Sequence, residues 1–390
     1  MGIYITTSIL LLIFTLNILL KEYGYFKYIN ITIYIYISIF LCFSYMPGSD
    51  WRQYELLYYG KGSYENLEIG YYIFFSLFKI FSINFWHYFI LVKLILFSAT
   101  IILFNKINKN SSKNLSIMYY IIYFGIFLWI DCPFRNLIAT VIGNYAIYKY
   151  LKNDKISSIL FITIAISFHR SAIILFFILI LINIKMSKHL FIVLFIIINI
   201  LFFNLNLFAN IISWITSKII FLNKYNSYIG LFLAFTKPSI LSLNLVGNLI
   251  VFLMILFYYD KLCTSKYFNQ LVNLYLIYYI SFRSGLVFPI MFRLQFYTAF
   301  YFCILIGLLF TYLSSKYLKL ISILFMFILA FFPLLNKITF DSRYIPYTNY
   351  LVELTKGDKN FDDRSSYNSI NSPYSRINQW YITNPEDLAK

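Results

Sequence analysis

The sequence has few charged residues for its length. Only 12% of its 390 residues are Asp, Glu, Lys or Arg, whereas 61% are hydrophobic. A soluble domain has about a quarter charged and about half apolar residues, so this composition excludes a soluble fold. Apolar runs long enough to cross about 30 Å of hydrocarbon recur along the chain. The sequence therefore predicts an all-α polytopic integral membrane protein.

Several familiar motifs are also missing. There is no Walker loop, dinucleotide fingerprint or Ser-His-Asp order, and the four cysteines have neither disulfide nor metal-ligand spacing. We therefore expect no metal and no cofactor. The net charge of +17 would suit a nucleic-acid partner, but the lysines occupy short turns between apolar runs, where positive charge sets topology. The expected partner is the lipid bilayer, and no nucleic acid.

The apolar runs predict about 12 transmembrane helices within one domain, residues 1–335. The expected spans are 3–20, 28–46, 85–104, 115–130, 135–150, 156–169, 171–184, 190–208, 241–259, 268–282, 294–313 and 318–335. Residues 71–82 are too short to span with certainty and suit an interfacial or re-entrant helix. Residues 47–70 and 209–240 are predicted as periplasmic loops, and 336–390 as a polar periplasmic tail with local order at most.

Lysines and arginines divide between the two predicted faces. Lysines fill alternate turns, which assigns those turns to the cytoplasmic side and both termini to the outer side, which is the periplasm for a bacterial inner membrane. Every arginine falls on the other side: Arg52, Arg135, Arg170, Arg283, Arg293, Arg343, Arg364 and Arg376. A guanidinium is a planar fork that suits phosphate oxygens. An AT-rich genome explains lysine wherever only charge matters, but the arginines still need a role.

A predicted hairpin, Trp129 to Ser171, brings ionisable residues to one face. Arg135 follows Pro133 at a helix start, where free N–H groups and the helix dipole favour an anion; alternatively it pairs with Asp131 or extends to the interface. His169 suits a general base or a hydrogen bond to a sugar, or else only packs. Arg170 points about 100° away around a helix.

Two carboxylates flank the 47–70 loop. Asp50 follows Gly48, which permits a tight turn, and Glu68 precedes Gly70. Such a pair suits activation of a hydroxyl or binding of a sugar. The alternative is a solvated loop whose acids cap helices.

Two further arginines bracket a break in the chain. Arg283 and Arg293 lie on either side of Gly285 and Pro289. A broken helix at membrane depth is tolerated beside protein or water, and two arginines there indicate a polar pocket. Lys93, in the middle of the 85–104 span, points to the same pocket unless it reaches the interface.

An ordered set of short motifs resembles the EpsG/Wzy-type polymerases of bacterial polysaccharides. The motifs are GSDWRQY, EIGYYIF, FRNLIA, FHRSA, RLQFY after a proline, and YIPY, between about residues 45 and 350. The family pattern places Asp50 with a following Tyr54, Glu68, Arg135 with an amide residue, His169, a later arginine, and Tyr347. The sequence departs from it at Asn136, where the family commonly has Gln, so the amide has a shorter reach.

The resemblance implies a GT-C-like fold and a glycosyltransferase that joins undecaprenyl-pyrophosphate-linked repeat units into O-antigen, capsule or exopolysaccharide at the periplasmic face. Asp50 and His169 are then the candidate catalytic residues. The candidate substrate-binding residues are Arg135, Arg293, Arg283, Glu68, Asn136, Tyr54, Arg170 and Tyr347. A chain-length regulator is a possible partner.

Two alternatives stay open. An O-antigen ligase would use the same donor but favours a long outer loop with its own arginines, whereas 209–240 carries lysines. A lipid-linked glycan flippase needs polar groups along a path open to both faces, whereas the candidates here collect on one predicted face.

Overall fold

The computed structural model describes most of the chain. The described residues are 1–17, 26–46, 48, 50–62, 64, 67–108, 113–218, 242–265, 267–285, 291–340, 344–356 and 364–366. They form helices and turns, with a single antiparallel bridge between Ser44 and Asn349. The prediction of an all-helical chain is confirmed for this part of the protein.

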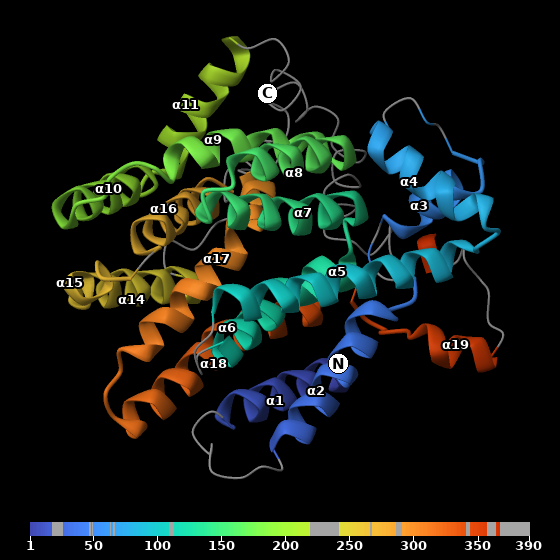
Figure 1. The fold of residues 1–390 in the computed structure, drawn as a ribbon, viewed down its shortest axis with the longest axis horizontal. Helices are drawn as coiled ribbons and strands as arrows, with labels where there is room; N and C mark the ends of the chain where they lie inside the picture. The colour runs from blue at the N-terminus through green and yellow to red at the C-terminus, as the bar shows by residue number, and fades with distance from the viewer. Residues whose placement is uncertain are drawn as a thin grey trace.

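Figure 1 shows the arrangement of the helices. They are α1 (Gly2–Leu16), α2 (Phe26–Cys42), α3 (Trp51–Tyr58), α4 (Ile69–Ile80), α5 (Phe85–Ile107), α6 (Lys113–Tyr120), the π-helical turns η1 (Ile121–Gly125) and η2 (Phe127–Asp131), α7 (Phe134–Leu151), α8 (Lys155–Phe168), the 3-10 turn η3 (Arg170–Ile173), α9 (Ile174–Leu181), α10 (Lys188–Leu201), α11 (Leu205–Lys218), α14 (Leu243–Phe257), α15 (Tyr259–Leu262), α16 (Phe268–Gly285), α17 (Met291–Thr311), α18 (Lys316–Phe340) and α19 (Tyr350–Lys356).

Three of the described helices are long and apolar enough to cross a bilayer: α5, α17 and residues 316–336 of α18. Shorter apolar helices accompany them, including α1, α4, α8, α10 and α14. One predicted span is broken and another is shortened. The 190–208 span ends with α10 at Leu201 before α11 begins at Leu205. The 171–184 span is present as one apolar helix, η3 continued by α9, and ends at Leu181.

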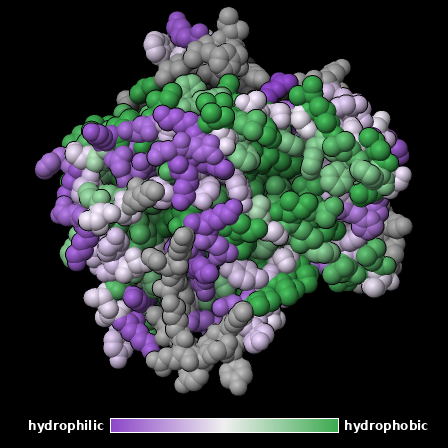
Figure 2. Space-filling model, in the orientation of Figure 1, coloured by the Kyte–Doolittle hydropathy of each residue, from purple (hydrophilic) through white to green (hydrophobic). Residues whose placement is uncertain are grey.

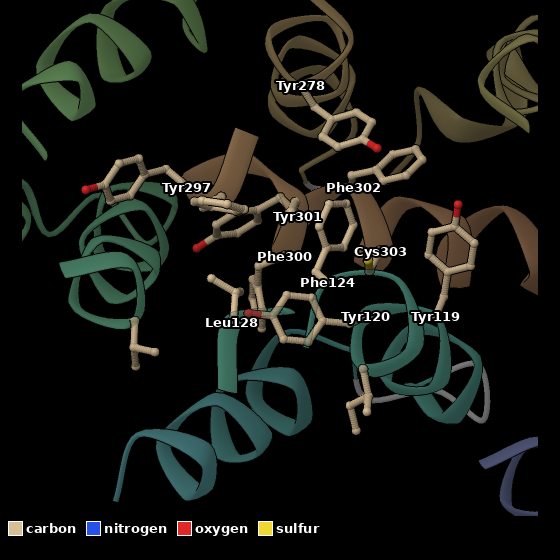
Figure 3. Packing of buried hydrophobic residues seen from close by; sticks show 14 of the residues in the cluster. Tyr119, Tyr120, Phe124, Leu128, Tyr278, Tyr297, Phe300, Tyr301, Phe302 and Cys303 are labelled. Carbon is tan, nitrogen blue, oxygen red and sulfur yellow. The ribbon is translucent and has the colours of Figure 1, made fainter. Parts of the chain in front are cut away.

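Helix α17 lies at the centre of the bundle, packed against α16, α6 and α7. Its aromatic residues interlock with those of its neighbours (Figure 3). The ring of Phe302 stacks on that of Tyr278 in α16, with centroids 4.1 Å apart. The ring centroid of Phe300 lies 4.2 Å from that of Phe104 in α5. Such ring pairs add to the burial of their large apolar surfaces. The tyrosine- and phenylalanine-rich composition therefore serves the core as well as the surface.

Polar side chains begin several helices by capping free N–H groups. Asn84 accepts from the amide of His87 at the start of α5, and Asp154 accepts from Ser157 at the start of α8. Asp50 and Glu68 occupy the same position before α3 and α4, but neither side chain caps its helix. The capping alternative is therefore wrong for both acids.

Both predicted loops contain helix. The 47–70 segment, predicted as a loop, includes α3, whose Trp51 and Tyr54 are buried. The 209–240 segment begins inside α11, which runs to Lys218, and its residues 219–240 lie outside the described part. The predicted 71–82 helix is present as α4.

The residues after α18 pack on the body of the protein. Helix α18 ends at Phe340, beyond the expected boundary at 335. The amide of Tyr45 then donates to Thr348 at 3.0 Å, and that of Tyr350 donates to Phe43 at 2.8 Å. The buried Tyr4 hydroxyl of α1 donates to the carbonyl of Tyr344. The expectation of only local order from 336 onward is wrong for residues 344–356.

The bundle has two chemically different ends. Figure 1 shows α3, α4 and α19 at the right of the view, and α15 with the turn between α17 and α18 at the left. We call these the site end and the lysine end. Hydrophilic side chains gather toward the left of the same view, and hydrophobic ones cover much of its centre and right (Figure 2).

Candidate functional site

Glu68 lies at the meeting point of three helices at the site end. It precedes α4 and is only 8% exposed. One carboxylate oxygen lies 3.2 Å from Nδ1 of His169, which ends α8. The other accepts from Nη1 of Arg135, in the first turn of α7. The backbone amide of Arg170 also donates to Glu68, at 3.4 Å.

The predicted hairpin produces this meeting. Helices α7 and α8 pack side by side, joined by a turn in which Lys149 pairs with Asp154 at 2.9 Å. Because the two helices run in opposite directions, the start of α7 and the end of α8 lie together. Arg135 and His169 are thereby brought to the same place, as the sequence predicted. Arg135 pairs with Glu68. This contact is neither the pair with Asp131 nor the extension to the interface that the sequence left open.

The ion pair fixes the charge of Glu68. Burial alone would raise the pKa of this carboxyl, but the hydrogen bond with His169 and the charge of Arg135 outweigh it and lower the pKa to about 2. Glu68 is therefore an anion at neutral pH. It can accept hydrogen bonds but cannot serve as a general acid.

The ionised carboxylate also sets the tautomer of His169. An anion only accepts hydrogen bonds, so Nδ1 of the ring must carry the proton that faces Glu68. In the neutral ring, Nε2 then holds the free lone pair. His169 is half-buried. This carboxylate–imidazole pair is arranged as an oriented base.

Arg135 keeps part of its side chain, 24%, exposed. Its Nη1 is engaged by Glu68, whereas its buried Nε has no hydrogen-bond partner among the described residues. The guanidinium carbon lies 5.9 Å from the centre of the Tyr54 ring. Burial and then the charge of Asp50 raise the pKa of Tyr54, while Arg135 lowers it, so both charged groups lie near the Tyr54 hydroxyl.

Asp50 sits on a turn that requires glycine. Gly48 has a φ of 70°, a left-handed conformation that other residues adopt at a cost. A Cβ at this position would lie 2.9 Å from the carbonyl carbon of Asp131 and closer still to two of its oxygens. The close approach brings the segment before α3 against the end of η2, at the edge of the Glu68 site.

The whole sequence matches one known family. The model of the EpsG family matches residues 3–349. The chain belongs to the EpsG family. No curated protein and no solved structure matches it.

In this EpsG-family chain a second group of polar side chains lies beside the Glu68 cluster. Two of its members, Tyr297 and Ser171, were not predicted from the sequence. The hydroxyl of the buried Tyr297 in α17 lies 3.4 Å from the amide oxygen of Asn136 and 3.2 Å from the hydroxyl of Ser171. Asn136 follows Arg135, and Ser171 lies two residues after His169. A signal was present in the RLQFY motif, because Tyr297 is one helical turn after Arg293 and shares its face.

The remaining arginines have different surroundings. Arg293 is exposed, and its charge lies near enough to Tyr297 to act on that hydroxyl. Arg170 is exposed. Arg283 instead donates to the carbonyl of Phe202 at the end of α10, at 3.0 Å, and lies over the Phe202 ring. The structure therefore does not bring Arg283 to the Glu68 site, and Pro289 lies outside the described residues.

Tyr347 also lies elsewhere. Its hydroxyl donates to the carbonyl of Phe40 at 2.6 Å, and its ring packs against Tyr4 and Phe40 at 5.9 and 5.1 Å. These contacts join the segment after α18 to α1 and α2. In this EpsG-family chain Tyr347 therefore has a packing role between these elements, and none of its contacts is with Glu68.

Lys93 is buried in the middle of α5. It is 0% exposed, and its ammonium donates to the hydroxyl of Ser44 at 2.7 Å and lies 5.1 Å from the centre of the Phe89 ring. It does not reach an interface. A buried amine is retained where polar partners hold it, and here Ser44 belongs to the segment that leads to Gly48 and Asp50.

Proposed function

We propose that this protein is an inner-membrane polymerase that joins undecaprenyl-pyrophosphate-linked oligosaccharide repeat units into a polysaccharide at the periplasmic face. Membership of the EpsG family supports a role in polysaccharide biosynthesis. The observation that carries the proposal is Glu68, which binds both a guanidinium and an imidazole at one end of the bundle. That arrangement pairs a base with a diphosphate-binding cation.

In the proposed reaction, a hydroxyl of the acceptor repeat unit attacks the anomeric carbon of the donor glycan. His169 Nε2 takes the hydroxyl proton while the new C–O bond forms. The bond from the anomeric carbon to the diphosphate oxygen breaks, and undecaprenyl diphosphate leaves with the bonding electrons. Glu68 holds the ring in position and stabilises the imidazolium as it forms.

The arginine acts on the leaving group. Negative charge develops on the diphosphate oxygens as the bond breaks, and a preorganised guanidinium stabilises it. Arg135, whose side chain is 24% exposed, and the exposed Arg293 and Arg170 are the proposed donors. Asn136, Tyr297 and Ser171 provide hydrogen-bonding groups for the sugar beside them.

The geometry favours His169 over Asp50 as the base. The charge of Asp50 acts on the Tyr54 hydroxyl, whereas His169 shares the carboxylate of Glu68 with Arg135. We assign Asp50 and Tyr54 to binding of the glycan. The proposal also includes the predicted membrane spans, the GT-C-like topology and a chain-length regulator as a partner.

One experiment separates the proposal from its alternatives. The gene is deleted and complemented with the wild type or with His169→Gln, and the surface and lipid-linked glycans are compared. A polymerase defect leaves single repeat units on the acceptor and removes the ladder. Full-length polymer retained on undecaprenyl diphosphate would instead identify a ligase, and lipid-linked units trapped in the cytoplasmic leaflet a flippase. An unchanged ladder after deletion contradicts all three.

A further inference from the structure

An apolar pocket lies far from the Glu68 site. Its volume is about 130 Å³, and it opens between α14, α17 and α18, with Leu115 of α6 among its lining residues. The wall is almost entirely hydrocarbon, including Met254, Leu309, Phe325 and Met326. A cavity of about 150 Å³ with such a lining stays dry and takes up a hydrocarbon the size of benzene. This pocket is therefore suited to a few methylene groups of an alkyl chain.

The pocket belongs to the lysine end of the bundle. Tyr297 of the site and Leu309 of the pocket lie on the same helix, α17, twelve residues apart, which is about 18 Å along a helix axis. Leu313, another lining residue, lies just before the turn into α18. A diphosphate held by Arg135 at the site end would thus lie well away from this pocket.

Two lysines lie close to the pocket lining along α18. Lys316 and Lys319 are in the first turn of α18, and Lys319 is one turn before the lining residue Ser322, on the same face. Lys316 is exposed and Lys319 is half-buried. Neither forms a salt bridge within the described part of the chain.

A third lysine reaches the same region. The ammonium of Lys261 lies 6.0 Å from the centre of the Tyr258 ring. Tyr258 stacks on Tyr312 at 5.8 Å, and Tyr312 directly precedes Leu313 of the pocket wall. Asp260 is the acidic neighbour of Lys261 in α15, so the mouth remains net positive. In the view of Figure 2, hydrophilic residues cover this end.

We propose that the pocket and its lysines bind an anionic phospholipid of the bilayer. One acyl chain enters the pocket between α14, α17 and α18, and the phosphate lies against Lys316, Lys319 and Lys261. Basic groups near a membrane surface attract anionic head groups, with about 1 kcal/mol for each lysine, and the apolar pocket adds burial of the chain. The proposal is independent of the polymerase assignment.

The test compares two lipids on the purified full-length protein. Phosphatidylglycerol and phosphatidylcholine with identical acyl chains are added in detergent, and thermal stability and bound lipid by native mass spectrometry are measured. We expect phosphatidylglycerol to raise Tm by several degrees more than phosphatidylcholine and to remain bound. The double variant Lys316→Gln/Lys319→Gln should lose that difference, and high salt should weaken it.

Two further variants make the result specific. Lys61→Gln/Lys79→Gln removes two exposed lysines beside α3 and α4, at the opposite end of the bundle, and should keep the preference for phosphatidylglycerol. Met254→Trp fills the pocket and should lower retention of both lipids. Equal effects of the two lipids on the wild type, or an equal loss in the Lys61/Lys79 control, would overturn the proposal. Displacement of phosphatidylglycerol from the pocket by undecaprenyl phosphate would overturn the assigned occupant.

Discussion

At the scale of single residues, Glu68 connects the guanidinium and the imidazole of the site. Its carboxylate is nearly buried, and each of its oxygens has a partner on a different helix. Removal of one partner of such a buried pair leaves the other charge uncompensated, which costs more than the pair itself contributes. Substitutions here should therefore change both chemistry and stability.

Glu68→Gln should abolish most activity while it preserves the shape of the side chain. An amide cannot stabilise the imidazolium of His169 and leaves Arg135 without its counter-ion. We expect a loss of polymerisation rate of roughly 100-fold or more, in the range found when a positioned acid–base partner is removed. Polymer formation by the purified protein from a lipid-linked repeat unit measures the effect. Activity within a few fold of the wild type would contradict the oriented-base assignment.

The same residue predicts a dependence of stability on pH. The pKa of Glu68 falls from an ordinary 4.5 to about 2 in the fold, so its contribution is complete above pH 4.5 and is lost as the pH falls toward 2. We expect the wild type to lose on the order of 2 kcal/mol of unfolding free energy over that window through this group. Glu68→Gln should lack that component, whereas the control Glu353→Gln in α19 should retain it.

Arg135→Lys tests the guanidinium fork. Lysine keeps the charge, and therefore much of the attraction to Glu68, but offers a point charge in place of several fixed donors. We expect activity to fall by roughly 10- to 100-fold with a smaller loss of stability, because one bidentate contact contributes a few kcal/mol in a transition state. Lys149→Arg, at the far end of α7, is the matched control. Equal activity of Arg135→Lys and the wild type would rule out a clamp.

At the scale of helices, the contact between α4 and α8 positions Glu68 against His169. Gly70 lies two residues after Glu68, and a Cβ there would lie 2.7 Å from the carbonyl oxygen of Ser167 and closer still to its hydroxyl. Ser167 lies two residues before His169. The glycine therefore permits an approach that any side chain would prevent.

Gly70→Ala should separate these two helices. The carbonyl of Ser167 is backbone and cannot rotate away, so we expect a destabilisation of roughly 1–3 kcal/mol and a loss of activity beyond that explained by stability. Thermal unfolding and the polymerisation assay measure the two effects. Gly125→Ala is the control, because a Cβ at Gly125 has its nearest neighbour at 3.5 Å. If Gly70→Ala has wild-type activity and stability, the close approach is not required.

At the scale of the whole molecule, the two ends carry different chemistry. The Glu68 site lies at the end with α3, α4 and α19, and the lysine-rich ends of α15 and α18 lie opposite (Figure 1). The segment 344–356 returns to the site end and contacts α1 and α2 through Tyr344 and Tyr347. It thus closes the bundle beside the first two helices.

The orientation of the bundle can be tested by cysteine labelling. Cys263 at the lysine end is exposed, whereas Cys42, Cys132 and Cys303 are buried. Lys61 at the site end is also exposed. A membrane-impermeant maleimide applied to intact spheroplasts should label Lys61→Cys in a Cys263→Ser background, and should label Cys263 of the wild type only after lysis. Labelling of Cys263 before lysis would reverse the proposed orientation.

The sequence predicted the part of the site that depends on local order along the chain. Two antiparallel helices joined by a short turn must bring Arg135 and His169 together, and the turn signals at Lys149 to Asp154 are local. The EpsG family was likewise evident from short ordered motifs and is confirmed. Sequence reasoning did not predict contacts that depend on packing. Arg283 contacts the end of α10. Tyr347, although it belongs to the YIPY motif, contacts α1 and α2.

By itself the sequence determined the helical class, the apolar character and the hairpin, because these follow from composition and from the periodicity of neighbouring residues. Only the tertiary structure decided that Glu68 joins Arg135 to His169, and that Tyr297 lies against Asn136 and Ser171. These contacts span separations of 67 to 161 residues along the chain. Such contacts depend on how closely the helices approach. Gly70 and Gly48 permit a close approach, but no local sequence pattern predicts it.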